Sequence, residues 1–171
     1  MTATETPQAA TPENGGIGRE LATGKLTDEM LARMRDLIGT ELRTDACVNN
    51  EYATRLAILR FAEGIGDDNP LWTDAEYAAK GPYGTIIAPP SFIFACLGSV
   101  QVGWPGLGGF HAETDITFHA PIKVDDKITA RVWFDGFDDP VESSFGGRRI
   151  KDYLRQEYTN QDGELVANGV V

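Results

Sequence analysis

The chain has 171 residues, which is enough for one domain with a substantial core, and its composition is that of an ordinary globular protein. Its net charge of −11 argues against binding to nucleic acid or to anionic membranes, because both need clustered Lys and Arg. No apolar run reaches the ~20 residues that span a bilayer, and no basic segment followed by an apolar one begins the chain, as a secretory signal would. We therefore expect a cytoplasmic protein whose partners include neither nucleic acid nor a membrane.

The first part of the chain predicts a tail followed by a helix. Residues 1–24 have almost no large apolar side chain, so we expect a disordered tail there and a folded domain over residues 25–171. Thr27 suits a helix cap and Gly39 a helix end, and apolar residues recur between them at helical spacing: Met30, Met34, Leu37 and Ile38. Residues 41–48 are weakly strand-like.

Three further helices are predicted in the middle of the chain. One runs from a cap at Asn50 to Glu63, and a short one begins with a capping box at residues 73–76 and stops at Gly81. Residues 91–100 are nearly all apolar, which predicts a helix that is buried on all sides.

The second half of the chain changes to the period-two alternation of antiparallel strands, predicted at residues 116–120, 128–134, 150–158 and 165–171. A long loop is expected over residues 135–148, and Asp-Gly at 162–163 predicts a hairpin turn. Helices followed by consecutive strands indicate an α+β fold rather than alternating βαβ units. The chain ends within a predicted strand, which keeps open that it is one part of a longer protein.

One segment, residues 64–72 (Gly-Ile-Gly-Asp-Asp-Asn-Pro-Leu-Trp), combines permissive glycines with two carboxylates, an amide and a proline that stops a helix. On residue types alone, this segment is predicted to be a turn. It resembles, however, the motif of the MaoC-like dehydratases, which are (R)-specific enoyl-thioester hydratases with the approximate motif G-D-x-N-P-L-H. Residues 61–66 and 83–92 match this family as well, most closely its N-terminal, fatty-acid-synthase-like dehydratase branch. The resemblance covers roughly residues 39–171.

This resemblance implies a hot-dog fold, in which an antiparallel sheet wraps around one long buried helix and two such units pair. It implies that an Asp and a His five residues later hold a water, and that backbone N–H groups near the start of the buried helix hold the thioester oxygen. Asp67 matches the position of the Asp, but Trp72 stands where the His falls. Because an indole nitrogen only donates, Trp72 cannot act as a base. It either contributes to the acyl pocket or is an ordinary buried aromatic.

The other site residues are predicted by the same resemblance. Asp67 is the catalytic candidate, or else a carboxylate that caps its turn. Asn69 contacts substrate, or bonds the backbone of its own loop. Ser91 and Phe92 are expected to bind substrate through their backbone N–H groups, since the two prolines before them have none. Ser91 is not expected to be a nucleophile, because no Gly-x-Ser-x-Gly segment surrounds it.

Several other residues are weaker candidates. His111 and His119 are the only histidines, and neither lies at the motif position. Cys47 and Cys96 predict neither a disulfide framework nor a metal site, and we expect no cofactor. The one dense basic cluster either binds the phosphates of coenzyme A or is a solvated strand edge: Arg148, Arg149, Lys151 and Arg155.

Three functions stay open. The first is an acyl-thioester-binding subunit of a heteromeric enoyl-CoA hydratase, in which a second hot-dog subunit carries the Asp and His and the ligand is an acyl-CoA or an acyl-carrier thioester. The second is a self-sufficient enzyme, as a hydratase or a hot-dog thioesterase that uses Asp67, alone or as a homodimer. The third is a non-enzymatic assembly module.

Overall fold

The computed structural model describes residues 24–98, 100, 107–144 and 147–171. The predicted tail lies outside the described residues, except for Gly24. The described chain forms a five-stranded antiparallel sheet in the order β1-β3-β6-β7-β2. Its strands are β1 (Glu41–Leu42), β2 (Asp115–Phe118), β3 (Thr129–Phe137), β6 (Asp152–Thr159) and β7 (Leu165–Val170).

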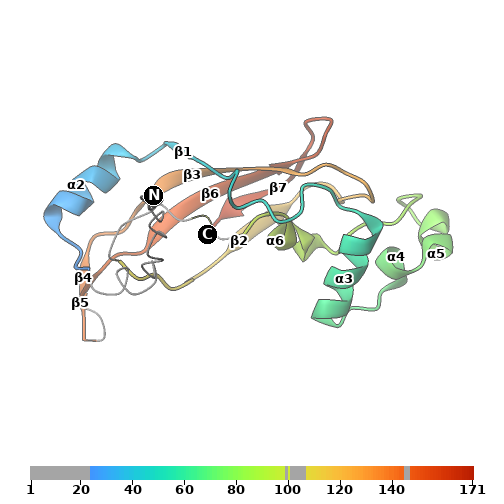
Figure 1. Cartoon of the computed structure of the whole chain (residues 1–171), viewed down its shortest axis with the longest axis horizontal. Coiled ribbons are helices and arrows are strands. Elements are labelled where there is room, and N and C mark those ends of the chain that lie inside the picture. Colours follow the sequence, from blue (N-terminus) through green and yellow to red (C-terminus); the bar gives the residue numbers. More distant parts are fainter. Residues whose placement is uncertain (1–23, 99, 101–106, 145–146) are drawn as a thin grey trace, which may run out of the picture.

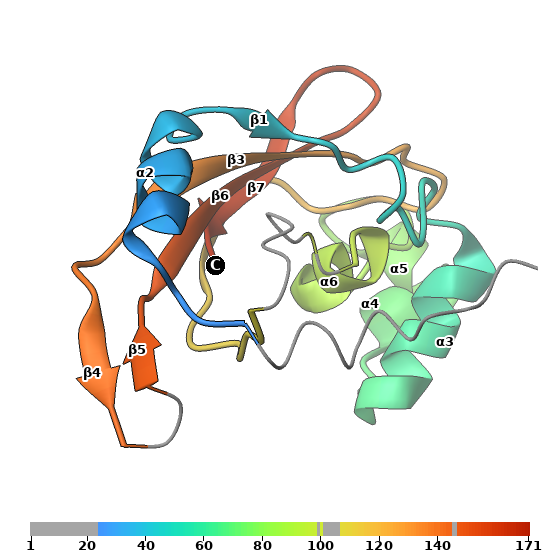
Figure 2. The same cartoon turned by 60° about the vertical axis from the view of Figure 1, so that its left-hand side comes forward.

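Helices lie at both ends of this sheet. Figure 1 shows α3 (Arg55–Ile65), α4 (Pro70–Thr73) and α5 (Ala75–Lys80) grouped at one end, and α2 (Asp28–Asp36) at the other. Between them, the turn η1 (Pro90–Phe92) and the helix α6 (Ile93–Cys96) pack beside the sheet (Figure 2). Apart from the two residues of β1, the helices precede the antiparallel strands along the chain, which confirms the predicted α+β class. No helix of the described part of the chain is long and apolar enough to cross a membrane.

The predicted helix over residues 91–100 is much shorter than expected. It consists of one 3-10 turn and the four residues of α6, after which Leu97 is extended and pairs with Val48. The carbonyl oxygen of Cys96 accepts from the N–H groups of Asn49 and Asn50, at 2.9 and 3.3 Å. These bonds come from a segment far away in the sequence and satisfy the helix end, after which the chain is extended at Leu97. The expectation of one long buried helix is therefore wrong.

Two helix starts differ from the predictions. Thr54, and not Asn50, caps α3 by accepting from the N–H of Ala57. Asp74, and not Thr73, caps α5 by accepting from the N–H groups of Glu76 and Tyr77, so the helix begins one residue later than predicted and has no capping box. Local signals identified each helix, but several residues nearby could serve as the cap, and the fold decides which of them is in place.

Local signals were sufficient at both ends of the described chain. Thr27 caps α2 as predicted, and Leu31 and Met34 are fully buried in a small cluster around Phe134 of β3. The hairpin turn at 160–163 is also confirmed, because the Asn160 side chain accepts from the N–H of Asp162 within the turn and from the N–H of Glu164 just after it. The predicted long loop over residues 135–148 is wrong in part: it contains a small hairpin of β4 (Val141–Ser143) and β5 (Gly147–Arg149).

Candidate functional site

The motif begins where α3 ends. Gly66 closes this helix in the left-handed conformation, with φ of 71°. The N–H of Asp67 then returns to the carbonyl oxygen of Ala62 at 2.9 Å. The Asp67 side chain is half-buried, and its Oδ1 accepts from the N–H of Asn69 at 3.1 Å. At least one carboxylate oxygen of Asp67 therefore stabilises the turn that contains it, which is the structural role that the sequence offered as the alternative to catalysis.

Asn69 caps the next helix. Its Oδ1 accepts from the N–H of Leu71 at 3.0 Å, and its carbonyl oxygen accepts from the N–H of Trp72 at 3.2 Å. Pro70 follows at the first helical position, where a missing N–H costs nothing. These hydrogen bonds give Asn69 a structural role in its own loop, so contact between Asn69 and a substrate stays a prediction.

Trp72 lies in the main core and is only 8% exposed. Its backbone is held from α3, because Arg55 donates to the carbonyl oxygens of Trp72 and Thr73 at 2.9 and 2.6 Å. Its indole Nε1 is a buried donor without a hydrogen-bond partner among the described residues. No sequence signal pointed to Arg55, since its role depends on the packing of α3 against α4.

The start of η1 offers only one of the two backbone N–H groups, those of Ser91 and Phe92, that were expected to bind the thioester oxygen. Phe92 is fully buried, and its ring meets Phe61 edge to face with centroids 5.5 Å apart. The N–H of Phe92 donates to the carbonyl oxygen of Pro89 at 2.8 Å. Of the two predicted donors this one is engaged, which leaves the N–H of Ser91 as the candidate at this helix start.

Ser91 borders a cavity of about 540 Å³ between η1, α6 and β2, which is wide-mouthed and largely open to solvent. Its walls are mainly apolar, with the two hydroxyls of Ser91 and Thr114: Pro90, Ser91, Phe94, Thr114, Ile116 and Phe118. The period-two pattern predicted that Ile116 and Phe118 share one face of a strand, but not which element faces them. Asp67, Asn69 and Trp72 do not line this cavity. Trp72 lies in the core cluster that also contains Phe92, the residue after Ser91.

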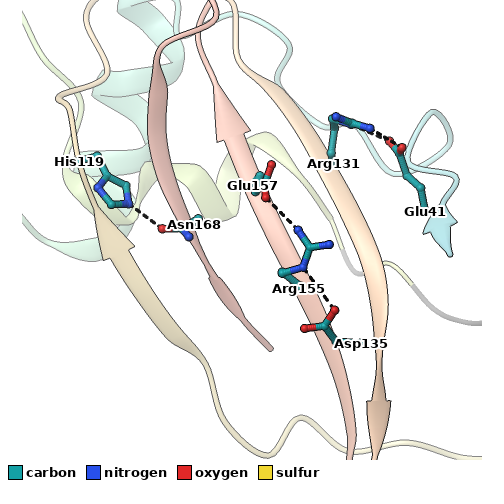
Figure 3. Close-up of polar contacts among 7 residues, drawn as sticks. All are labelled: Glu41, His119, Arg131, Asp135, Arg155, Glu157 and Asn168. Carbon is teal, nitrogen blue, oxygen red and sulfur yellow. Dashed lines mark hydrogen bonds and ion pairs between the residues drawn. The ribbon is translucent and has the colours of Figure 1, made fainter. Parts of the chain in front are cut away.

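The histidines lie away from the motif. His119 is exposed, with Nε2 2.6 Å from Oδ1 of Asn168 on the neighbouring strand (Figure 3). His111 is also exposed and bonds Thr114 at 3.1 Å. Neither residue contacts Asp67 in the described structure, so the pair of Asp and His that the resemblance implies is not assembled within this chain.

The basic cluster is largely neutralised by carboxylates. Arg148 pairs with Asp28 at 2.6 Å, and Lys151 pairs with Glu113 at 2.7 Å. Arg155 contacts Asp135 and Glu157 (Figure 3) and stacks on Trp133, with its guanidinium carbon 4.2 Å from the ring centroid. These pairs favour a solvated sheet surface over a phosphate site. No three His, Cys, Asp or Glu side chains of the described ranges form a group that could hold a metal ion.

Known proteins are similar to this chain in sequence and in fold. The family profile described as "FAS1-like, dehydratase domain region" matches residues 37–169. A UPF0336 protein of Streptomyces avermitilis is 30% identical over 124 residues, which are 68% of this chain and 79% of that protein. A 3-hydroxybutyryl-CoA dehydratase of Methylorubrum extorquens is 30% identical over 76 residues, which are 44% of this chain and 48% of that protein.

Two solved structures are similar in fold. The HadBC (3R-hydroxyacyl-ACP dehydratase) complex of Mycobacterium tuberculosis has a chain 25% identical with a TM-score of 0.56, covering 79% of this chain and 95% of that one. The MaoC-like dehydratase of Rhodospirillum rubrum is 20% identical with a TM-score of 0.56, covering 80% of this chain and 94% of that one. The hot-dog plan that the motif implied is thereby confirmed, with a shorter central helix. The chain belongs to the family described as "FAS1-like, dehydratase domain region".

Proposed function

We propose that this chain is the acyl-thioester-binding subunit of a heteromeric enoyl-thioester hydratase, whose second hot-dog subunit supplies the Asp and His that activate water. The observation that carries the proposal is Trp72, buried at the motif position of the catalytic His. An indole cannot take a proton from water, and both histidines of the chain are exposed elsewhere.

The acyl group has a suitable place in the cavity next to η1. Phe94, Ile116 and Phe118 provide apolar surface for the chain of a fatty acyl group. The N–H of Ser91, at the start of η1, is the donor for the thioester oxygen, where enolate charge develops during hydration or dehydration. This chain therefore binds the acyl thioester, and the partner subunit supplies the catalytic base.

The partner fits at the edge of the sheet. β2 is the last strand in the order β1-β3-β6-β7-β2, so one of its edges is unpaired among the described strands. Phe118 of β2 and Phe94 of α6 both line the cavity and are 46% and 47% exposed, so they leave apolar surface open beside this edge. A second hot-dog chain added at β2 covers both the strand edge and these rings. The HadBC complex, made of two named subunits, supports a heteromeric arrangement.

The test is hydration of crotonyl-CoA by the chain alone, by a hot-dog partner that carries both motif residues, and by the two together. The chain alone is expected to fall ~10²–10⁴-fold below the complex, because it lacks a positioned acid–base group. Asp67→Asn in this chain is expected to leave the rate of the complex unchanged. Strong hydration by the chain alone, abolished by Asp67→Asn, would overturn the proposal.

The same samples decide between the remaining functions. Release of free thiol from acyl-CoA by the chain alone, sensitive to Asp67→Asn, identifies a self-sufficient thioesterase. Absence of acyl-thioester binding in both the chain and the complex identifies an assembly module.

A further inference from the structure

The described residues that line the cavity beside Ser91 include no charged side chain. Glu113, the residue before Thr114 of the cavity wall, forms an ion pair with Lys151, with Nζ and Oε2 2.7 Å apart. The same ammonium lies 5.4 Å from the ring centroid of Tyr153. The cation next to this wall is therefore already neutralised by a carboxylate of the chain itself.

The strand β2 and the residues on either side of it carry negative charge only. Residues 107–122 contain Glu113 and Asp115, both exposed, and no Lys or Arg. The whole chain has a net charge of −11. A partner that covers the edge of β2 is thus favoured when the surface that it turns to this chain is basic, because opposite charges orient and stabilise an encounter.

Basic side chains on the sheet are engaged in the same way as Lys151. Arg131 and Arg155 contact carboxylates on the sheet surface (Figure 3). In the basic cluster, Arg149 has no carboxylate partner within the described structure, and it lies on β5 in the separate two-stranded sheet. A single exposed guanidinium does not make a site for several phosphate charges.

The thiol part of an acyl thioester is anionic, since coenzyme A and the phosphopantetheine arm of a carrier protein both bear phosphate. This inference rests on the proposed function, in which the acyl end lies in the cavity. The cavity is wide-mouthed, and the long pantetheine arm takes the phosphates away from it. We propose that the partner subunit binds these phosphates with Lys and Arg side chains on the surface that it places against β2, while this chain binds the acyl end alone.

The test compares butyryl-CoA with butyryl-N-acetylcysteamine, which has the same acyl thioester and no phosphate. Dissociation constants are measured by calorimetry between about 0.05 and 0.3 M salt, for the full chain alone and for its complex with a hot-dog partner. The chain alone is expected to bind butyryl-CoA no more tightly than the neutral ligand. Its affinity for butyryl-CoA should rise with salt, because salt screens the repulsion between the phosphates and the acidic chain.

The complex is expected to behave in the opposite way. It should bind butyryl-CoA about tenfold or more tightly than the neutral ligand, and this preference should shrink as salt rises. Butyryl-phosphopantetheine identifies which phosphates are bound, because it carries the phosphate that coenzyme A and a carrier protein share. A full gain with this ligand places the partner's cations at the shared phosphate, whereas a gain with butyryl-CoA alone places them at the nucleotide phosphates.

Two matched substitutions test the charge at the cavity wall. Glu113→Gln releases the ammonium of Lys151 beside the cavity, so the chain alone should gain a preference of about two- to fivefold for butyryl-CoA. Glu41→Gln makes the same change in net charge and releases Arg131, but at β1, the opposite edge of the sheet from β2. This control should leave the preference unchanged.

Tighter binding of butyryl-CoA than of the neutral ligand by the unmodified chain alone, weakened by salt, would overturn the inference while the proposed function stands. The inference also fails if the complex does not distinguish the two ligands, or if Glu113→Gln behaves like Glu41→Gln. If neither thioester binds to the chain or to the complex, the proposed function itself fails.

Discussion

The guanidinium of Arg55 holds the carbonyl oxygen of Trp72, with Nη1 and the oxygen 2.9 Å apart. Arg55 is the first residue of α3, and Trp72 lies in α4, so one side chain ties the end of the short helix to the start of the longer one. Its second nitrogen reaches the carbonyl oxygen of Thr73 at 2.6 Å. A helix of four residues has little stability of its own, and this fork explains how the motif loop keeps its shape.

Arg55→Ala is expected to lower the free energy of unfolding by about 1.5–3 kcal/mol, because two hydrogen bonds from a charged group are lost in a half-buried position. Arg55→Lys should recover only part of this, since one ammonium cannot reproduce the planar fork. Chemical denaturation provides the measurement. Arg60→Ala is the matched control on the same helix: its pair with Glu63 is exposed, and a change within about 0.5 kcal/mol is expected. An equal loss in both variants would contradict the role of Arg55.

Substitutions at Asp67 separate its structural role from its charge. Asp67→Asn keeps an oxygen that accepts from the N–H of Asn69, so stability should stay within about 0.5 kcal/mol of wild type. Asp67→Ala removes this bond and should cost about 1 kcal/mol. Thermal and denaturant unfolding measure both, with the exposed neighbour in Asp68→Ala as the control. A loss for Asp67→Asn as large as that for Asp67→Ala would show that the fold needs the charge of Asp67 and not its hydrogen bond within the turn.

Asn69→Ala should lower stability by about 0.5–2 kcal/mol, the usual cost of losing a helix cap. Asn69→Asp retains the accepting oxygen and should lose much less. If Asn69→Ala leaves unfolding unchanged but weakens the binding of butyryl-CoA, then Asn69 is a substrate residue and its bonds in the loop are incidental.

Phe92 and Phe94 are two residues apart but have different environments. Phe92 is fully buried against Phe61, so Phe92→Ala should cost about 3–5 kcal/mol. Phe94 is 47% exposed and lines the cavity, so Phe94→Ala should cost far less stability and instead weaken acyl-thioester binding or pairing with the partner. Denaturation and calorimetry distinguish these effects. Unchanged ligand binding and unchanged assembly in Phe94→Ala would exclude the cavity as the acyl site.

Stability should fall in alkaline solution because of two buried groups, the thiol of Cys96 at the end of α6 and the phenol of Tyr158 in β6. Burial raises the pKa of the Cys96 thiol to about 12, and burial followed by the neighbouring Cys96 raises the pKa of Tyr158 to about 12. Both groups are neutral when protonated, so the folded state holds these protons more tightly than the unfolded state. This contribution is complete below the unfolded pKa values of about 8.5 and 10 and is lost as the pH rises toward 12.

Unfolding measured between about pH 8 and about pH 11 tests this slope. Tyr158→Phe should make the decline shallower, although it also leaves Oε1 of Gln156 without its bond from the phenol. Tyr77→Phe, at an exposed position, should leave the slope unchanged. An identical slope in all three proteins would mean that Tyr158 does not govern the alkaline decline.

Short-range sequence signals determined the parts of this fold that are held by hydrogen bonds between residues close together in the sequence. Thr27 with its helix, and the turn at residues 160–163 between β6 and β7, are held by side chains bonding the backbone within four residues, so the amino-acid order specifies them directly. The alternation of Ile116 and Phe118 was also readable, because side chains alternate along any strand. The sequence further determined that position 72 has a donor and no base, since this is a property of indole.

Tertiary structure decided the features that depend on distant partners. The buried helix ends at Cys96 because Asn49 and Asn50 take its last carbonyl oxygen, and nothing within residues 91–100 encodes that contact. Likewise, only the packing of α3 against α4 brings Arg55 to the carbonyl oxygen of Trp72 and leaves the indole nitrogen without an acceptor. A residue's capacity to donate or accept is fixed by its chemistry, whereas the bond it makes depends on which groups the rest of the chain places within reach.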